Sequence, residues 1–185
     1  MNAIDIMISE HTNVKRILKV ARALCANILE KDEVLYDDFE SLIYIIRNYA
    51  DTHHHQKEEQ ILFDIMIKNL GELAEKVVRH GMMVEHDYGR LYVKNLEIAL
   101  NEVKSGNNEY KLDIIANAVS YTNLLERHID KEDRVVFTFA NRELSKELLQ
   151  QIDRDCMIYE EKHSETRDKC INILEDLENK LQISK

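Results

Sequence analysis

The segment Asp51-Thr-His-His-His-Gln-Lys-Glu-Glu-Gln-Ile-Leu-Phe63 carries three consecutive histidines and two glutamates, and no Gly or Pro interrupts it. On an α-helix, which turns by about 100° per residue, Glu58 lies about 40° from His54 and His55 lies about 100° from it. Apolar residues fall in or beside the same arc, at Ile61, Leu62 and Ile65. We therefore expect His54, Glu58 and His55 to lie on the buried face of a helix.

The same helical wheel turns His53 and Glu59 away from that buried face. Burying ionisable side chains beside Ile and Leu is unfavourable unless something compensates their charge or their lost hydrogen bonds. A bound cation provides such compensation, so the pattern indicates a metal site.

The composition predicts an all-α protein. The chain has 185 residues, no Pro, 4 Gly and 32% charged residues. Its formal net charge of −10 argues against nucleic acid or an anionic membrane as a partner. We see no apolar run of the ~20 residues that a membrane span needs, and no signal peptide at the start. The three Cys residues form no CxxC pair, which is typical of free thiols in a reducing cytoplasm.

Apolar periodicity and loop signals divide the chain into helices. We expect them at residues 4–30, 37–69, 72–103, 109–141 and 144–181. Because short loops make neighbouring helices antiparallel, residues 1–142 are predicted to form an up-down-up-down antiparallel four-helix bundle. Residues 143–185 then form an additional C-terminal helical segment, which either packs on the bundle as an appendage or mediates a homodimer.

Four of the predicted helices bring inward-facing ligand-type residues to the same end of this bundle. His11 and His86 come early in their helices, whereas His54 and His128 come late. In an up-down arrangement these positions lie at one level. The predicted inner stripe of the fourth helix contains Ile114, Ala118, Tyr121, Leu125, His128, Glu132, Val135, Val136 and Phe139.

The motif His-x-x-x-Glu occurs twice, as His54 with Glu58 and as His128 with Glu132. A spacing of four residues places both side chains on one helix face. Imidazole and carboxylate together suit iron, manganese or zinc, and two carboxylates from facing helices can bridge two metal ions. Without ligand cysteines, a structural zinc or iron–sulfur site is disfavoured.

These motifs resemble the hemerythrin-like family, whose members carry the HHE cation-binding domain. The resemblance covers about residues 5–140 and depends on Glu10-His11, His54-His55-Gln-Lys-Glu58-Glu59, Glu85-His86-Asp87 and His128-Ile-Asp-Lys-Glu132-Asp133. It implies an antiparallel four-helix bundle that holds two iron ions in a non-haem di-iron centre. It further implies that Glu58 and Glu132 bridge the ions, and that the terminal ligands are His11, His54, His86 and His128.

Two positions depart from the oxygen-carrying hemerythrins. Those proteins have a second histidine four residues before the one that matches His86, where this chain has Met82. His55 is close enough on the helical wheel to replace it. Oxygen carriers also use an Asp that matches Asp133, but Glu132 lies nearer the inner face. The chain therefore resembles the diverse HHE proteins more than the dedicated oxygen carriers.

Other polar residues near these motifs have simpler expected roles. We expect His53, His80 and His163 at the surface, Glu59 and Asp133 in solvent, and Tyr121 in the core or hydrogen-bonded near the site. The ferritin pattern of Glu-x-x-His needs an inward Glu beside His11 or His86, and none is expected there.

The resemblance implies binding of dioxygen or nitric oxide at an open iron position, in oxygen handling or stress response. Two alternatives remain open: a di-iron enzyme that reduces peroxide, and a redox or iron sensor that acts through the C-terminal helix. Whether the protein is an enzyme is left open by the sequence.

Overall fold

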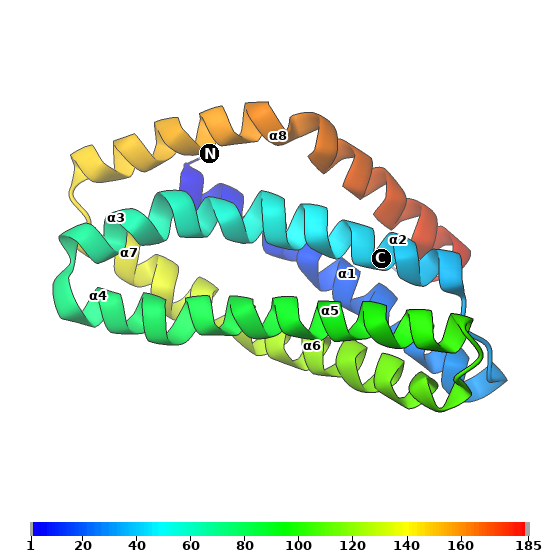
Figure 1. Ribbon diagram of the computed structural model, residues 1–185. Helices are drawn as coiled ribbons and strands as arrows, with labels where there is room; N and C mark the ends of the chain where they lie inside the picture. The colour runs from blue at the N-terminus through cyan, green and yellow to red at the C-terminus, as the bar shows by residue number, and fades with distance from the viewer. Residues whose placement is uncertain (1, 184–185) are drawn as a thin grey trace.

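The computed structural model describes residues 2–183, and these residues are almost entirely helical. Met1 and residues 184–185, at the ends of the two predicted domains, lie outside the described part. Five helical stretches follow one another and pack side by side as a helical bundle (Figure 1). The predicted all-α class is confirmed.

Most of these stretches consist of several segments. Their bounds are α1 (Ala3–Lys31); α2 (Tyr36–Ile45), η1 (Ile46–His55), η2 (Glu58–Phe63) and α3 (Asp64–Asn69); α4 (Gly71–Val77), η3 (Val78–Met82) and α5 (Met83–Lys104); η4 (Asn108–Tyr110), α6 (Lys111–Lys131), η5 (Glu132–Val136) and α7 (Phe137–Glu143); and α8 (Lys146–Lys180). The predicted helix limits agree with these bounds to within a few residues.

Local signals in the sequence explain where the stretches begin and end. The side chain of Asn2 accepts a hydrogen bond from the amide of Asp5 and caps α1. Ser145 caps α8 in the same way. Gly71 and Gly106 have positive φ angles of 70° and 101°, which glycine adopts without strain, and both lie in turns between stretches.

Four of the segments are π-helical, and all four lie in the stretches that carry the predicted ligands. In a π-helix an amide bonds to the carbonyl five residues earlier, so each residue advances the helix by a smaller angle. Such bonds are formed from Gln56 to Asp51, from Met83 to Val78 and from Phe137 to Glu132. As one consequence Val135, which the α-helical stripe places inside, is 57% exposed, whereas Phe137 is buried.

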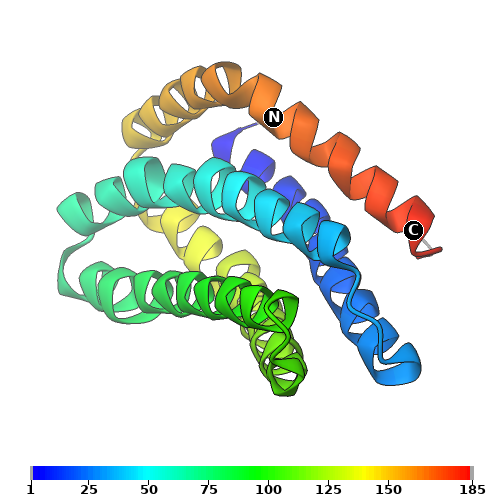
Figure 2. The same ribbon diagram turned by 45° about the vertical axis from the view of Figure 1, so that its right-hand side comes forward.

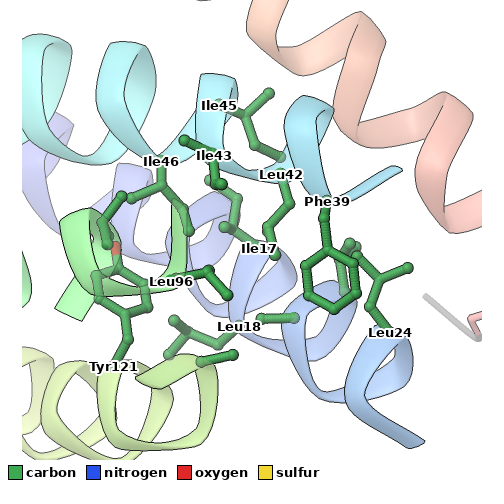
Figure 3. Packing of buried hydrophobic residues seen from close by; sticks show 14 of the residues in the cluster. Ile17, Leu18, Leu24, Phe39, Leu42, Ile43, Ile45, Ile46, Leu96 and Tyr121 are labelled. Atoms are coloured by element: carbon green, nitrogen blue, oxygen red, sulfur yellow. The ribbon is translucent and has the colours of Figure 1, made fainter. Parts of the chain in front are cut away.

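Two apolar clusters hold the bundle together, one on each side of the histidines. One cluster joins α1, α2, α5 and α6 around residues such as Leu18, Phe39 and Leu96 (Figure 3). The other contains Met7, Leu62, Phe63, Val136 and Phe137. In each of the first four stretches a predicted ligand lies between the two clusters: His11, His54, His86 and Glu132. Together with their neighbouring histidines they form a polar layer, the histidine layer, inside an otherwise apolar core.

The last helix, α8, lies along α1 and α2 (Figures 1 and 2). Its side chains Ile152, Cys156, Cys170, Leu174 and Leu177 are buried in the two apolar clusters. One face of α8 is therefore apolar and packs into the core. The helix covers one side of the histidine layer. Among residues 2–183, no helix combines the length and the apolar character that crossing a membrane requires.

Candidate metal centre

The structure brings all seven predicted ligand residues to one buried place. They form two sets of four that share Glu58, and within each set one donor atom per residue lies within 4.8 Å of the others. One set is His55, Glu58, His86 and His128, and the other is His11, His54, Glu58 and Glu132. A pair of four-donor sets joined by one carboxylate is an arrangement suited to two neighbouring cations.

The imidazole nitrogens and the carboxylate oxygens of the two sets converge closely. Nε2 of His11 lies 3.3 Å from Oε2 of Glu132, and Nε2 of His128 lies 3.1 Å from Oε1 of the same carboxylate. Nε2 of His54 lies 3.5 Å from Oε1 of Glu58. The Nε2 atoms of His86 and His128 are only 3.0 Å apart.

Several of these converging atoms are buried without a hydrogen-bond partner. They are Nε2 of His11, Nε2 of His54 and all four carboxylate oxygens of Glu58 and Glu132. Leaving a buried polar atom unsatisfied costs about 1–3 kcal/mol, and more when the group is charged. Six such atoms in one layer fit cations as their missing partners.

Each of four histidines binds a carboxylate through its other ring nitrogen. The Nδ1–H groups of His11, His54, His86 and His128 donate to Asp133, Glu10, Glu59 and Glu85 over 2.7, 2.8, 2.6 and 3.0 Å. This bond fixes the tautomer and turns Nε2 toward the centre, as in carboxylate–histidine–metal arrangements. His55 differs, since its Nδ1 lies 3.8 Å from Asp51.

These contacts correct several expectations. Glu59 and Asp133 are not simply solvated acids, because each orients a histidine. Glu10 is buried, so an inward Glu does accompany His11, although it bonds to His53 and His54 instead of joining the two donor sets. The sequence did contain a signal for these carboxylates that orient the histidines. In each of the first four stretches an acidic residue directly follows or precedes a predicted ligand.

The family comparison agrees with this geometry. The sequence pattern of the hemerythrin HHE cation binding domain matches residues 2–140. The chain belongs to the hemerythrin family. The resemblance drawn from its motifs is thereby confirmed.

Relatives of this hemerythrin-family chain include two uncharacterised proteins, one from Mycobacterium tuberculosis and one from Mycobacterium bovis. Each is 24% identical over 131 residues, which make up 71% of this chain and 50% of the relative. The chain thus spans about half the length of the curated relatives that it matches. No solved structure was found to match it.

Burial and mutual repulsion set the charges in this hemerythrin-type layer. Burial raises the pKa of Glu58 well above its usual value, and the nearby Glu132 adds to the effect. Burial also opposes the charge of Glu132, but His128 and His11 outweigh it and hold the pKa of that carboxyl well below its usual value. A cation bound between the two carboxylates would stabilise the ionised form of both.

The surroundings of each histidine determine whether its pKa is raised or lowered. Burial lowers the pKa of His54 to about 4 and that of His55 well below its usual value, so both are neutral and able to coordinate a metal. Burial also disfavours charge on His128, but Glu132 and Glu85 raise its pKa to about 9. Metal binding at His128 must therefore displace a proton.

A second buried cluster of charges joins the centre to α8. Lys57 is fully buried, and its ammonium group donates to both Glu10 and Glu160. His53, expected at the surface, is 1% exposed and donates to Glu10, so that expectation was wrong. Glu10, His53 and Glu160 could together hold a cation, but the ammonium of Lys57 already occupies that role.

The two remaining histidines belong neither to the two donor sets nor to the buried charge cluster around Lys57. His80 is exposed, as expected. His163 is partly buried because its ring stacks on Tyr159 at a centroid distance of 4.2 Å.

Proposed function

We propose that this chain is a non-haem di-iron protein that binds dioxygen or nitric oxide, in oxygen handling or in the response to oxidative or nitrosative stress. The proposal depends chiefly on the two donor sets that share Glu58 and on the buried, unpartnered oxygens of Glu58 and Glu132. Iron held by these residues would supply reversible coordination of a small diatomic ligand and the electrons that such a ligand takes up.

In this proposal each of the seven residues has a defined part. Glu58, which both donor sets share, and Glu132 would hold the ions through their carboxylates. His11 and His54 would provide imidazole ligands for one ion, and His55, His86 and His128 for the other. Four of these imidazoles are held at Nδ1 by carboxylates, so their Nε2 atoms are oriented before any metal binds.

Apolar neighbours support the same function by limiting the access of water on one side of the centre. The ring of Phe137 stacks on His11 at a centroid distance of 5.7 Å, and Phe63 stacks on His86 at 6.0 Å. Leu62 and Met82 are buried in the cluster next to the donor atoms. A dry site slows the exchange of a bound small molecule for water.

We also propose the finer architecture of the family for this chain. The first four stretches would form its up-down-up-down antiparallel four-helix bundle over residues 1–142, with residues 143–185 as a C-terminal extension. The three cysteines are free and buried, which fits the cytoplasmic location that we propose.

Metal content tests the proposal directly. Protein purified metal-free and then loaded anaerobically with ferrous iron should hold two irons per chain, measured by mass spectrometry of the metal. Glu58→Gln and Glu132→Gln should each lose most of this iron, whereas Glu126→Gln, an exposed site on α6, should not. Wild-type protein that binds less than about a fifth of an iron, or variants that bind as much as wild type, would exclude the site.

The contact of α8 with the cluster around Glu10 favours a second candidate, a redox or iron sensor. Glu160 on α8 is joined through Lys57 and Glu10 to His54. Iron loading should then change the rate of amide hydrogen exchange along α8. The exposed Met157 and Ile158 on the same helix offer a surface for the predicted homodimer. Unchanged exchange in α8, and an unchanged molecular mass on loading, would rule out signalling by this route.

A further inference from the structure

A cavity of about 410 Å³ lies directly beside the metal centre. Its wall is formed by Ile46 and His55 of η1, by His86 and Val93 of α5, and by Tyr121 of α6. The two histidines on its wall belong to the same donor set. The cavity therefore adjoins the candidate centre and is much larger than a diatomic ligand needs.

One polar group on the cavity wall is fully buried and has no partner within the protein. The hydroxyl group of Tyr121 is buried and has no hydrogen-bond partner. Figure 3 shows the phenol ring of Tyr121 with its oxygen directed toward Ile46, which also lines the cavity. Burial raises the pKa of this phenol, so it remains a hydrogen-bond donor. A buried hydroxyl without a partner is unfavourable unless a ligand or water accepts its hydrogen bond.

Most charges at the mouth of the cavity are already paired. Arg47 forms two hydrogen bonds of 2.7 Å with Glu97, and Arg90 binds Asp51 and Glu59. The remaining walls are largely apolar. Lys94 also lines the cavity, but it is exposed, so its ammonium stays hydrated and attracts an anion only weakly. The buried phenol is therefore the group that distinguishes one ligand from another.

We propose that this cavity binds a compact, uncharged organic molecule with one acceptor oxygen, such as a carbonyl compound, whose oxygen accepts a hydrogen bond from Tyr121. Its apolar body packs against Ile46 and Val93, and it lies between the solvent and the donor set of His55 and His86. Pockets of this size and character, apolar with a few convergent polar groups, are typical of small-molecule sites.

Acetophenone, a ketone that fits the volume and carries one acceptor oxygen, is the probe for this site. Ligand-observed NMR on the full metal-free chain should give a Kd at or below about 1 mM, because small apolar ligands gain only a modest free energy per atom. Using metal-free protein separates this test from the iron proposal, since either can fail alone. Absence of saturable binding up to about 10 mM overturns the proposal.

Two variants test the mode of binding. Tyr121→Phe removes only the donor and should weaken binding about 3- to 10-fold. Gly89→Ala should also weaken binding, because its added methyl group lines the cavity and meets the Tyr121 ring at 3.6 Å, which is ordinary contact that leaves the fold intact. Tyr88→Phe is the matched control for Tyr121→Phe, since Tyr88 lies on α5, is 51% exposed and does not line the cavity. Equal affinity in wild type and both cavity variants would place the probe elsewhere and refute the inference.

Discussion

Replacing Lys57 with Met tests how the last helix is coupled to the histidine layer. Lys57 is fully buried, and its ammonium group is shared by Glu10 and Glu160. Met fills a similar volume, so the change removes the positive charge without opening a large cavity. Removing one partner of a buried ion pair usually costs about 3–5 kcal/mol.

The structure indicates the lower end of that range. Glu10 keeps the hydrogen bonds from His53 and His54, and Glu160 keeps its contact with Arg167. We therefore expect the free energy of unfolding to fall by about 3 kcal/mol. For a chain of this length, each kcal/mol lowers Tm by about 2–4 °C, so Tm should drop by about 6–12 °C.

Circular dichroism melts of the metal-free chain measure this change. Lys19→Met, at an exposed site on α1, is the control and should melt like wild type. The double variant Lys57→Met with Glu160→Gln should recover part of the loss, because one of the two carboxylates that lost the ammonium group is then neutral. A drop of less than about 2 °C in the single variant, or no recovery in the double variant, would show that the buried charge cluster is not coupled as described.

Three further predictions address the histidine layer and its surroundings. Glu59→Gln should weaken iron binding about 10- to 100-fold in a chelator competition, because His86 loses the carboxylate that orients it; an affinity within twofold of wild type would contradict this. The pKa of His128 is raised from 6.5 to about 9, so its charge stabilises the metal-free protein fully below about pH 6.5 and no longer does so above about pH 9. Urea unfolding should show this alkaline loss in wild type and a smaller one in His128→Gln; equal losses would argue against it. Tyr159→Phe removes the hydrogen bond to the carbonyl of Thr52 and should lower Tm by about 1–6 °C, whereas an unchanged Tm would show that the bond contributes nothing.

The sequence was sufficient to predict the helices and the buried place where the candidate ligand residues come together. Spacing of four residues between His and Glu fixes a shared helix face whatever the neighbouring helices do, which is why His54 with Glu58 and His128 with Glu132 were found. The turns were marked by residues with strong local preferences, such as Gly71 and the segment around Gly106.

What the sequence did not reveal depends on contacts between distant parts of the chain. His53 was expected at the surface, but Glu160 of α8, more than 100 residues further along the chain, contacts both His53 and Lys57, and both side chains are buried. Helical wheels assume one constant turn angle, and the π-helical segments break that assumption where the ligands lie. The unused hydroxyl of Tyr121 depends on the shape of the cavity, which no periodicity encodes.

The π-helical segment η1 has a consequence for variation in chain length. A π-turn is equivalent to one extra residue accommodated within an α-helix, so a single deletion within Ile46–His55 can be absorbed by a return to ordinary α-helical winding. The later residues of that stretch, Glu58 among them, would then stay on the same face. The same deletion in the regular helix α1 would rotate all later residues of that helix by about 100°, so we expect η1 to tolerate a change of chain length better than α1.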